Sequence, residues 1–94
     1  MRRRNDIART VASLIRDWEH EKSYNEVGNL IVKTAALLSR VNDVPANVLQ
    51  ALDNVLSYDV VVSASSIYQV LHYLRELQKL DNLMSANRRL DAYE

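Results

Sequence analysis

The sequence predicts an all-α fold, a compact bundle of four main helices in a single domain spanning residues 1–94. Apolar residues recur at spacings of three and four through most of the chain, which is the period of one helix face. No Gly or Pro interrupts the longest such stretch, and 94 residues is an ordinary length for one domain. We predict helices over residues 5–22, 24–41, 45–56 and 63–90. The ends, residues 1–4 and 91–94, are expected to be flexible.

The first predicted helix, residues 5–22, begins where Asn5 or Asp6 can accept a hydrogen bond from a free amide of the first turn. Its apolar side chains form one stripe: Ile7, Val11, Leu14, Ile15 and Trp18. The opposite face carries charged residues: Arg9, Arg16, Asp17 and Glu19. This pattern is typical of a helix that packs one face against a core.

The second predicted helix, residues 24–41, has the clearest boundary signal, because Ser23 and Glu26 match the capping-box pattern. Its apolar stripe is broad: Val27, Leu30, Ile31, Leu37, Leu38 and Val41. The single glycine of the chain, Gly28, lies inside this helix and costs about 0.5–1 kcal/mol relative to Ala. Two interpretations stay open, a tolerated defect or a close crossing of two helices.

The third predicted helix, residues 45–56, follows a turn that ends at Pro45, a residue suited to the first turn of a helix. Its apolar residues are Val48, Leu49, Leu52, Val55 and Leu56. Residues 57–59 are then expected to form a turn. We predict that residues 60–62, three valines, are extended rather than helical, because β-branched side chains lose rotamer freedom in helices.

The fourth predicted helix, residues 63–90, would span roughly 40 Å at 1.5 Å per residue. Either Ser63 or Ser66 is expected to cap it, and Ser66 with Gln69 forms a second possible capping box. An alternative is a break near residues 81–82 that folds the end of the helix back onto the bundle.

Composition excludes several classes of function. The chain has no cysteine, so disulfides and thiolate metal sites are impossible, and no stretch approaches 18 consecutive apolar residues. The two histidines, His20 and His72, lie in no recognisable catalytic context, and the single glycine rules out the standard phosphate-binding loops. We predict a cytoplasmic, non-enzymatic protein with no cofactor, no metal and no membrane association.

Nucleic-acid binding is the alternative function. Residues 62–71 resemble the start of a helix-turn-helix recognition helix, which often opens with Ser and presents small polar side chains to base edges. The possible contact residues would be Arg2, Arg3 and Arg4 for phosphates, and Ser65, Ser66 and Gln69 for the groove. The turn lacks the usual Gly, and the net charge is zero rather than basic.

A protein-interaction role is the favoured prediction, because three shorter helices cannot cover both ends of a helix approaching 28 residues. The predicted interface residues are Tyr73, Leu77, Leu80, Leu83, Met84 and Leu90. A homodimer through the last helix is the expected assembly, since a two-fold dimer is the commonest oligomer. The protein would then act as an adaptor, regulator or inhibitor, with a protein partner whose identity the sequence does not give.

Overall fold

The structure is a computed structural model that describes the backbone of residues 2–20 and 23–93 and the side chains of residues 7–20, 23 and 25–80. Its four helices are α1 (Arg2–His20), α2 (Tyr24–Leu38), α3 (Ala46–Asn54) and α4 (Val60–Tyr93). The described residues contain no strand. The predicted all-α bundle of four helices is therefore confirmed.

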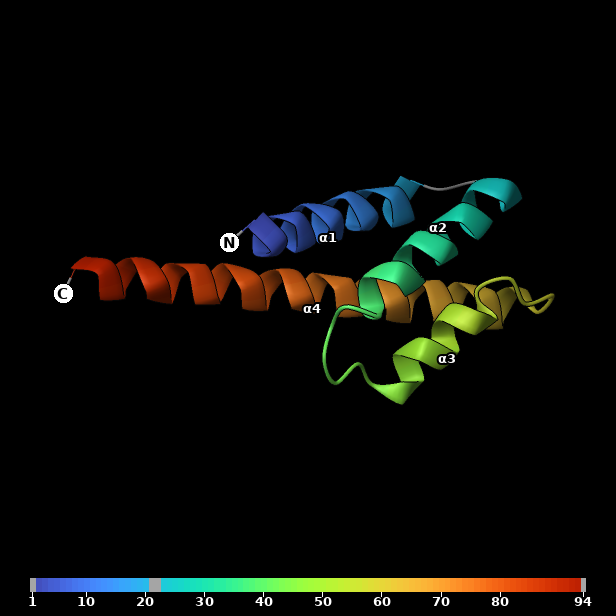
Figure 1. Ribbon diagram of the computed structural model, residues 1–94. Helices are drawn as coiled ribbons and strands as arrows, with labels where there is room; N and C mark the ends of the chain where they lie inside the picture. The colour runs from blue at the N-terminus through green and yellow to red at the C-terminus, as the bar shows by residue number, and fades with distance from the viewer. Residues whose placement is uncertain (1, 21–22, 94) are drawn as a thin grey trace.

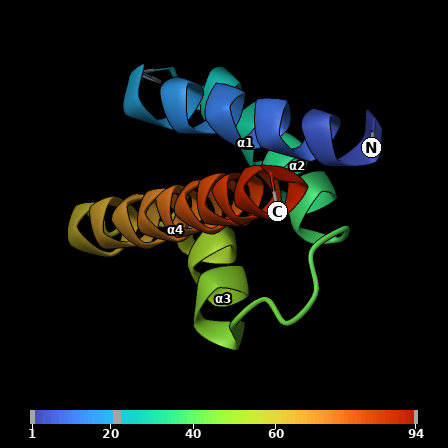
Figure 2. The same ribbon diagram turned by 90° about the vertical axis from the view of Figure 1, so that its left-hand side faces the viewer.

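Helix α4 is the axis of the bundle (Figure 1). Helices α1 and α3 lie on opposite sides of it, as the view along its length shows (Figure 2), and both pack against it. Helix α2 packs against α1. Because α4 is the element that contacts two others on opposite sides, its middle turns are the most deeply buried part of the chain.

The hydrophobic core forms around those turns, where Val70 and Leu74 are completely buried. The other buried apolar residues are Val11, Leu14, Ile15, Trp18, Leu30, Leu37, Leu38, Val48, Ala51, Leu52 and Val55. Most of the apolar stripes predicted for the first three helices supply this core, as their helical spacing requires.

A buried polar contact joins α1 to α2. The indole Nε1–H of Trp18 donates to Thr34 Oγ1 over 2.9 Å, and the Thr34 hydroxyl donates to the Leu30 carbonyl over 2.8 Å. Thr34 has no exposed surface and Trp18 is 5% exposed. The indole N–H is thus satisfied inside the core, which is the usual requirement for a buried tryptophan.

The start of α2 confirms one predicted cap. Ser23 is extended, and its hydroxyl accepts from the Glu26 amide over 3.1 Å. The helix ends at Leu38, three residues earlier than predicted. Beyond it, the amides of Arg40 and Val41 bond three residues back rather than four, so the last turn tightens.

Gly28 does not mark a close helix crossing. A Cβ built on this residue would meet no atom within 4 Å, and its φ is not positive. Of the two interpretations offered by the sequence, the structure supports the tolerated defect.

The start of α4 differs from the prediction, because Val60, Val61 and Val62 are helical rather than extended. Asp59 is the cap: its Oδ1 accepts from the amides of Val61 and Val62 over 2.9 and 3.3 Å. A cap contributes about 1 kcal/mol, which offsets a large part of the helix propensity that the three valines lose together.

The serines proposed as caps have other partners. Ser63 Oγ donates to the Val55 carbonyl, which ties α4 to the end of α3, and Ser66 Oγ donates to the Val62 carbonyl within α4. Both cap predictions are therefore wrong. Pro45 precedes α3 as its N-cap instead of lying in its first turn.

The alternative of a break near residues 81–82 is ruled out, because α4 is continuous over 34 residues, as the prediction of one long helix requires. Helix α1 begins at Arg2, so the predicted caps Asn5 and Asp6 lie inside it. The principal extents of the molecule are 55 × 22 × 20 Å. The long dimension follows α4, whose last turns run beyond the other three helices (Figure 1).

Candidate interaction surfaces

The first candidate surface is the C-terminal arm, which we define as residues 78–93 of α4. Leu80 is 57% exposed although it is apolar. Tyr73 and Leu77, just before the arm, are partly buried and pack against the core of their own chain. The side chains of Leu83, Met84 and Leu90 lie outside the described residues. Of the six predicted interface residues, Leu80 is the one that the structure places on the surface.

The hydroxyl of Tyr73 lies in a partly desolvated position at the base of the arm. Burial raises the pKa of Tyr73 above its ordinary value of 10.0, and the negative charge of Asp43 raises it further. Asp43 lies in the connection between α2 and α3 with a left-handed backbone, φ 61°, which Asp tolerates better than most residues. Tyr73 is therefore a neutral, packed side chain rather than a reactive group.

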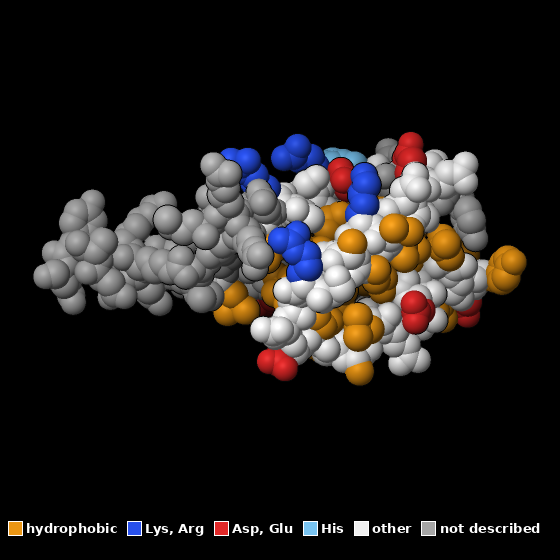
Figure 3. Space-filling view, in the orientation of Figure 1, with side chains coloured by type: hydrophobic (Ala, Val, Ile, Leu, Met, Phe, Trp, Pro, Cys, Tyr) orange, Lys and Arg blue, Asp and Glu red, His pale blue; other side chains and the backbone are white. Residues whose placement is uncertain are grey.

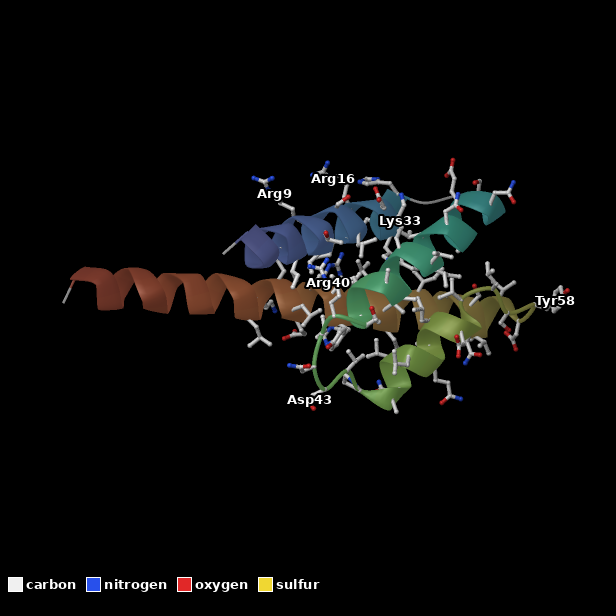
Figure 4. All side chains as sticks on the ribbon, viewed as in Figure 1. Arg9, Arg16, Lys33, Arg40, Asp43 and Tyr58 are labelled. Carbon is white, nitrogen blue, oxygen red and sulfur yellow. The ribbon has the colours of Figure 1, made fainter. Side chains whose placement is uncertain are left out.

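The second candidate surface, the apolar end, is at the opposite end of α4. Tyr58 is fully exposed, Val60 and Val61 are 79% and 76% exposed, and Tyr58 projects from the molecule (Figure 4). Beside them a hollow of about 320 Å³ lies between the start of α2, the end of α3 and the first turns of α4. Its apolar lining is Val27, Val55, Leu56, Val60 and Ile67. Contiguous exposed apolar surface is the usual mark of an interface.

The residues predicted to read a nucleic-acid groove do not form one surface. Ser65 and Gln69 are exposed and lie one turn apart, with Gln69 Nε2 at 3.5 Å from Ser65 Oγ. Ser66 is 4% exposed and its hydroxyl is engaged with the Val62 carbonyl. The side chains of Arg2, Arg3 and Arg4 lie outside the described residues.

Charge also disfavours phosphate contacts by α3 and the first half of α4. Residues 41–74 contain three acidic residues, Asp43, Asp53 and Asp59, and no Lys or Arg. The first basic residue beyond them, Arg75, is engaged with Glu19 of α1 through a contact of 2.7 Å between Nη2 and Oε2. A surface of this composition repels a phosphate backbone.

A third candidate surface, the basic groove, lies between α1 and α2 and has a volume of about 490 Å³. Its charged lining is Arg9, Asp17, Lys33 and Arg40, and Leu14, Ala36 and Leu37 form its apolar floor. On the face drawn in Figure 3, the basic side chains gather over α1 and α2 and the apolar side chains over α2 and α3. The described residues of the basic groove include three cations and one carboxylate, so the groove favours an anionic ligand.

The described residues offer little for metal or acid–base chemistry. No group of three or more His, Cys, Asp or Glu residues among them is placed to hold a metal ion. His72 Nε2 is 4.0 Å from Glu76 Oε1, and Lys79 Nζ is 3.6 Å from the same oxygen, all on the exposed face of α4. This is the ordinary pairing of residues three and four apart on a helix.

Comparison with protein-family models, with curated proteins and with solved structures finds no match to this chain. Within the described part of the chain, no helix has the length and the apolar character needed to cross a membrane.

Two of the three surfaces were missed by reasoning from the sequence. The apolar end was missed because the sequence predicts an extended segment at residues 60–62, whereas three valines in the first turn of a helix leave exposed apolar side chains on the surface. The basic groove was missed because a net charge of zero does not reveal that the basic and acidic residues are unevenly distributed along the chain. A count by segment would have found it: residues 1–40 hold eight basic and five acidic residues.

Proposed function

We propose that this protein is a non-enzymatic interaction module that forms a homodimer through the C-terminal arm of α4. The observation that carries the proposal is the mismatch in helix length. Helix α4 has 34 residues, whereas α1, α2 and α3 have 19, 15 and 9. The arm continues past the bundle with Leu80 exposed, and the sequence adds Leu83, Met84 and Leu90 along it.

A second copy of the chain is the occupant that suits the arm best. The arm has little net charge, since residues 78–93 hold three basic and two acidic residues, so two copies repel each other only weakly. Burying one leucine side chain is worth about 1.5–3 kcal/mol, so several apolar residues from each copy offset part of the entropic cost of association. As a dimer, the protein would work as an adaptor, regulator or inhibitor toward a further protein.

The test is the molar mass in solution. Light scattering behind size exclusion at micromolar concentration should give twice the chain mass of 10.8 kDa. The variant Leu80→Glu/Leu83→Glu should elute as a monomer with unchanged helical circular dichroism, because it places charge in the proposed interface.

The matched control is Leu49→Glu, a similarly exposed leucine on α3 away from the arm, at 46% exposure. This variant should remain a dimer. A monomeric wild-type protein, or equal loss of the dimer in both variants, would overturn the proposal.

A further inference from the structure

The basic groove between α1 and α2 has cations that no other described side chain neutralises. Arg9, Lys33 and Arg40 form no ion pair with another described residue, whereas the cations of α4 do, Arg75 at 2.7 Å and Lys79 at 3.6 Å. Asp17 is the one carboxylate among the described residues that line the groove. These residues therefore give the groove an excess of two positive charges.

Charge is distributed unevenly between the groove and the rest of the molecule. Although the net charge is zero, residues 41–74 supply three negative charges and no positive one. Helix α3, which lies within that segment, is on the side of α4 away from α1 (Figure 2). A neutral protein with separated charge presents its basic side to a polyanion and its acidic side to solvent.

The cations of α1 are arranged in a line. Arg9 and Arg16 are seven residues apart on α1, and Figure 4 shows both on the same side of the helix. Seven residues of helix rise about 10 Å, which is close to three steps of a nucleic-acid strand at about 3.4 Å each. The planar guanidinium of Arg also matches two phosphate oxygens better than the ammonium of Lys does.

We propose that the basic groove binds the phosphodiester backbone of a nucleic acid, without reading its sequence. Arg9, Lys33 and Arg40 contact phosphates, and Arg16 extends the contact along α1. The apolar floor of the groove offers no hydrogen bonds to base edges, and apart from the hydroxyls of Thr10 and Ser13 its described polar lining is charged, so the interaction depends mainly on charge. This surface is separate from the Ser65–Gln69 region and from the C-terminal arm.

The first test is the salt dependence of binding to a random-sequence DNA duplex and to a single strand, measured by gel mobility shift. Four phosphate contacts, from Arg9, Lys33, Arg40 and Arg16, predict a slope of log K against log salt of about −3.6 on duplex DNA, or about 150-fold weaker binding between about 50 and 200 mM salt. No binding of either probe at the lower salt concentration would overturn the proposal, and this measurement needs no variant.

The second test uses variants of exposed residues in the full chain. Arg9→Ala and Arg40→Ala should each reduce the magnitude of the slope by about 1, and the double variant by about 2. Arg75→Ala, an equal loss of charge on α4 at a residue outside both the groove and the arm, should leave the slope unchanged.

Polyglutamate is the competing probe, because the same cations would also attract an acidic protein. The expected result is that polyglutamate of equal charge displaces DNA only weakly. If polyglutamate binds more tightly than DNA, or if Arg75→Ala weakens DNA binding as much as Arg40→Ala does, the groove is not a phosphodiester site.

Discussion

At the scale of single residues, Thr34 is the polar residue on which the packing of α1 against α2 most depends. Replacing it by Val removes the only acceptor of the buried Trp18 N–H among the described residues. A buried donor without a partner costs about 1–3 kcal/mol, so we expect Thr34→Val to lower the free energy of unfolding by that amount. Urea denaturation measures the change.

A double-mutant cycle provides the control for this substitution. In a Trp18→Phe background no indole N–H is left to satisfy, so Thr34→Val should cost less there than in the wild-type protein. Equal costs in the two backgrounds would show that the hydrogen bond contributes nothing.

Gly28 offers the opposite case, a residue whose replacement should stabilise the protein. A Cβ at this position meets no atom within 4 Å and the backbone φ is not positive. We expect Gly28→Ala to raise the free energy of unfolding by about 0.5–1 kcal/mol through helix propensity. Ala35→Gly, at an exposed position of the same helix, should lower it by a similar amount. A destabilised Gly28→Ala variant would contradict the open surroundings of this residue.

At the scale of elements, the first turn of α4 depends on one side chain. Asp59 satisfies the amides of Val61 and Val62, which would otherwise have no partner within the helix. We expect Asp59→Ala to destabilise the protein by about 1 kcal/mol in thermal or urea denaturation. Asp59→Asn keeps an acceptor at the same place and should retain most of the stability. If both variants lose the same amount, charge rather than capping is responsible.

The elements also show what sequence patterns can and cannot predict. The spacing of apolar residues predicted all four helices, and the capping box predicted the start of α2. Both signals involve residues that are close together in the sequence, so they can be recognised without the fold. The predicted start of α4 is three residues too late, because the low helix propensity of the valines favours an extended segment and because residues 57–59 are expected to form a turn rather than a cap. The role of Ser63 could not be predicted, because its partner is the carbonyl of Val55, the C-cap of α3, eight residues earlier.

At the scale of the whole molecule, the shape departs from that of a compact domain. The radius of gyration is 14.8 Å, whereas about 12 Å is expected for a compact chain of this length. The difference comes from α4, which extends past the bundle. The sequence correctly predicted that the last helix is longer than the other three helices can cover. It left open whether the end of that helix would fold back onto the bundle.

The candidate surfaces were harder to predict than the fold, for a physical reason. Whether Ser66 faces solvent, or Leu80 faces the core, depends on which side of α4 the other helices occupy. The sequence gives the periodicity of each helix but not the direction from which its neighbours approach. The separation of charge between the α1–α2 side and the α3 side depends on the same arrangement. The arm and the basic groove share no residue, so the two proposals can be tested independently.

The position of Trp18 makes this protein convenient for spectroscopy. It is the only tryptophan in the chain, and it is buried with its indole nitrogen bonded across the α1–α2 interface. Its fluorescence emission therefore comes from a single environment and shifts to longer wavelength only when water reaches that interface. A stopped-flow trace of this signal would follow the separation of α1 from α2, with no label attached to the protein.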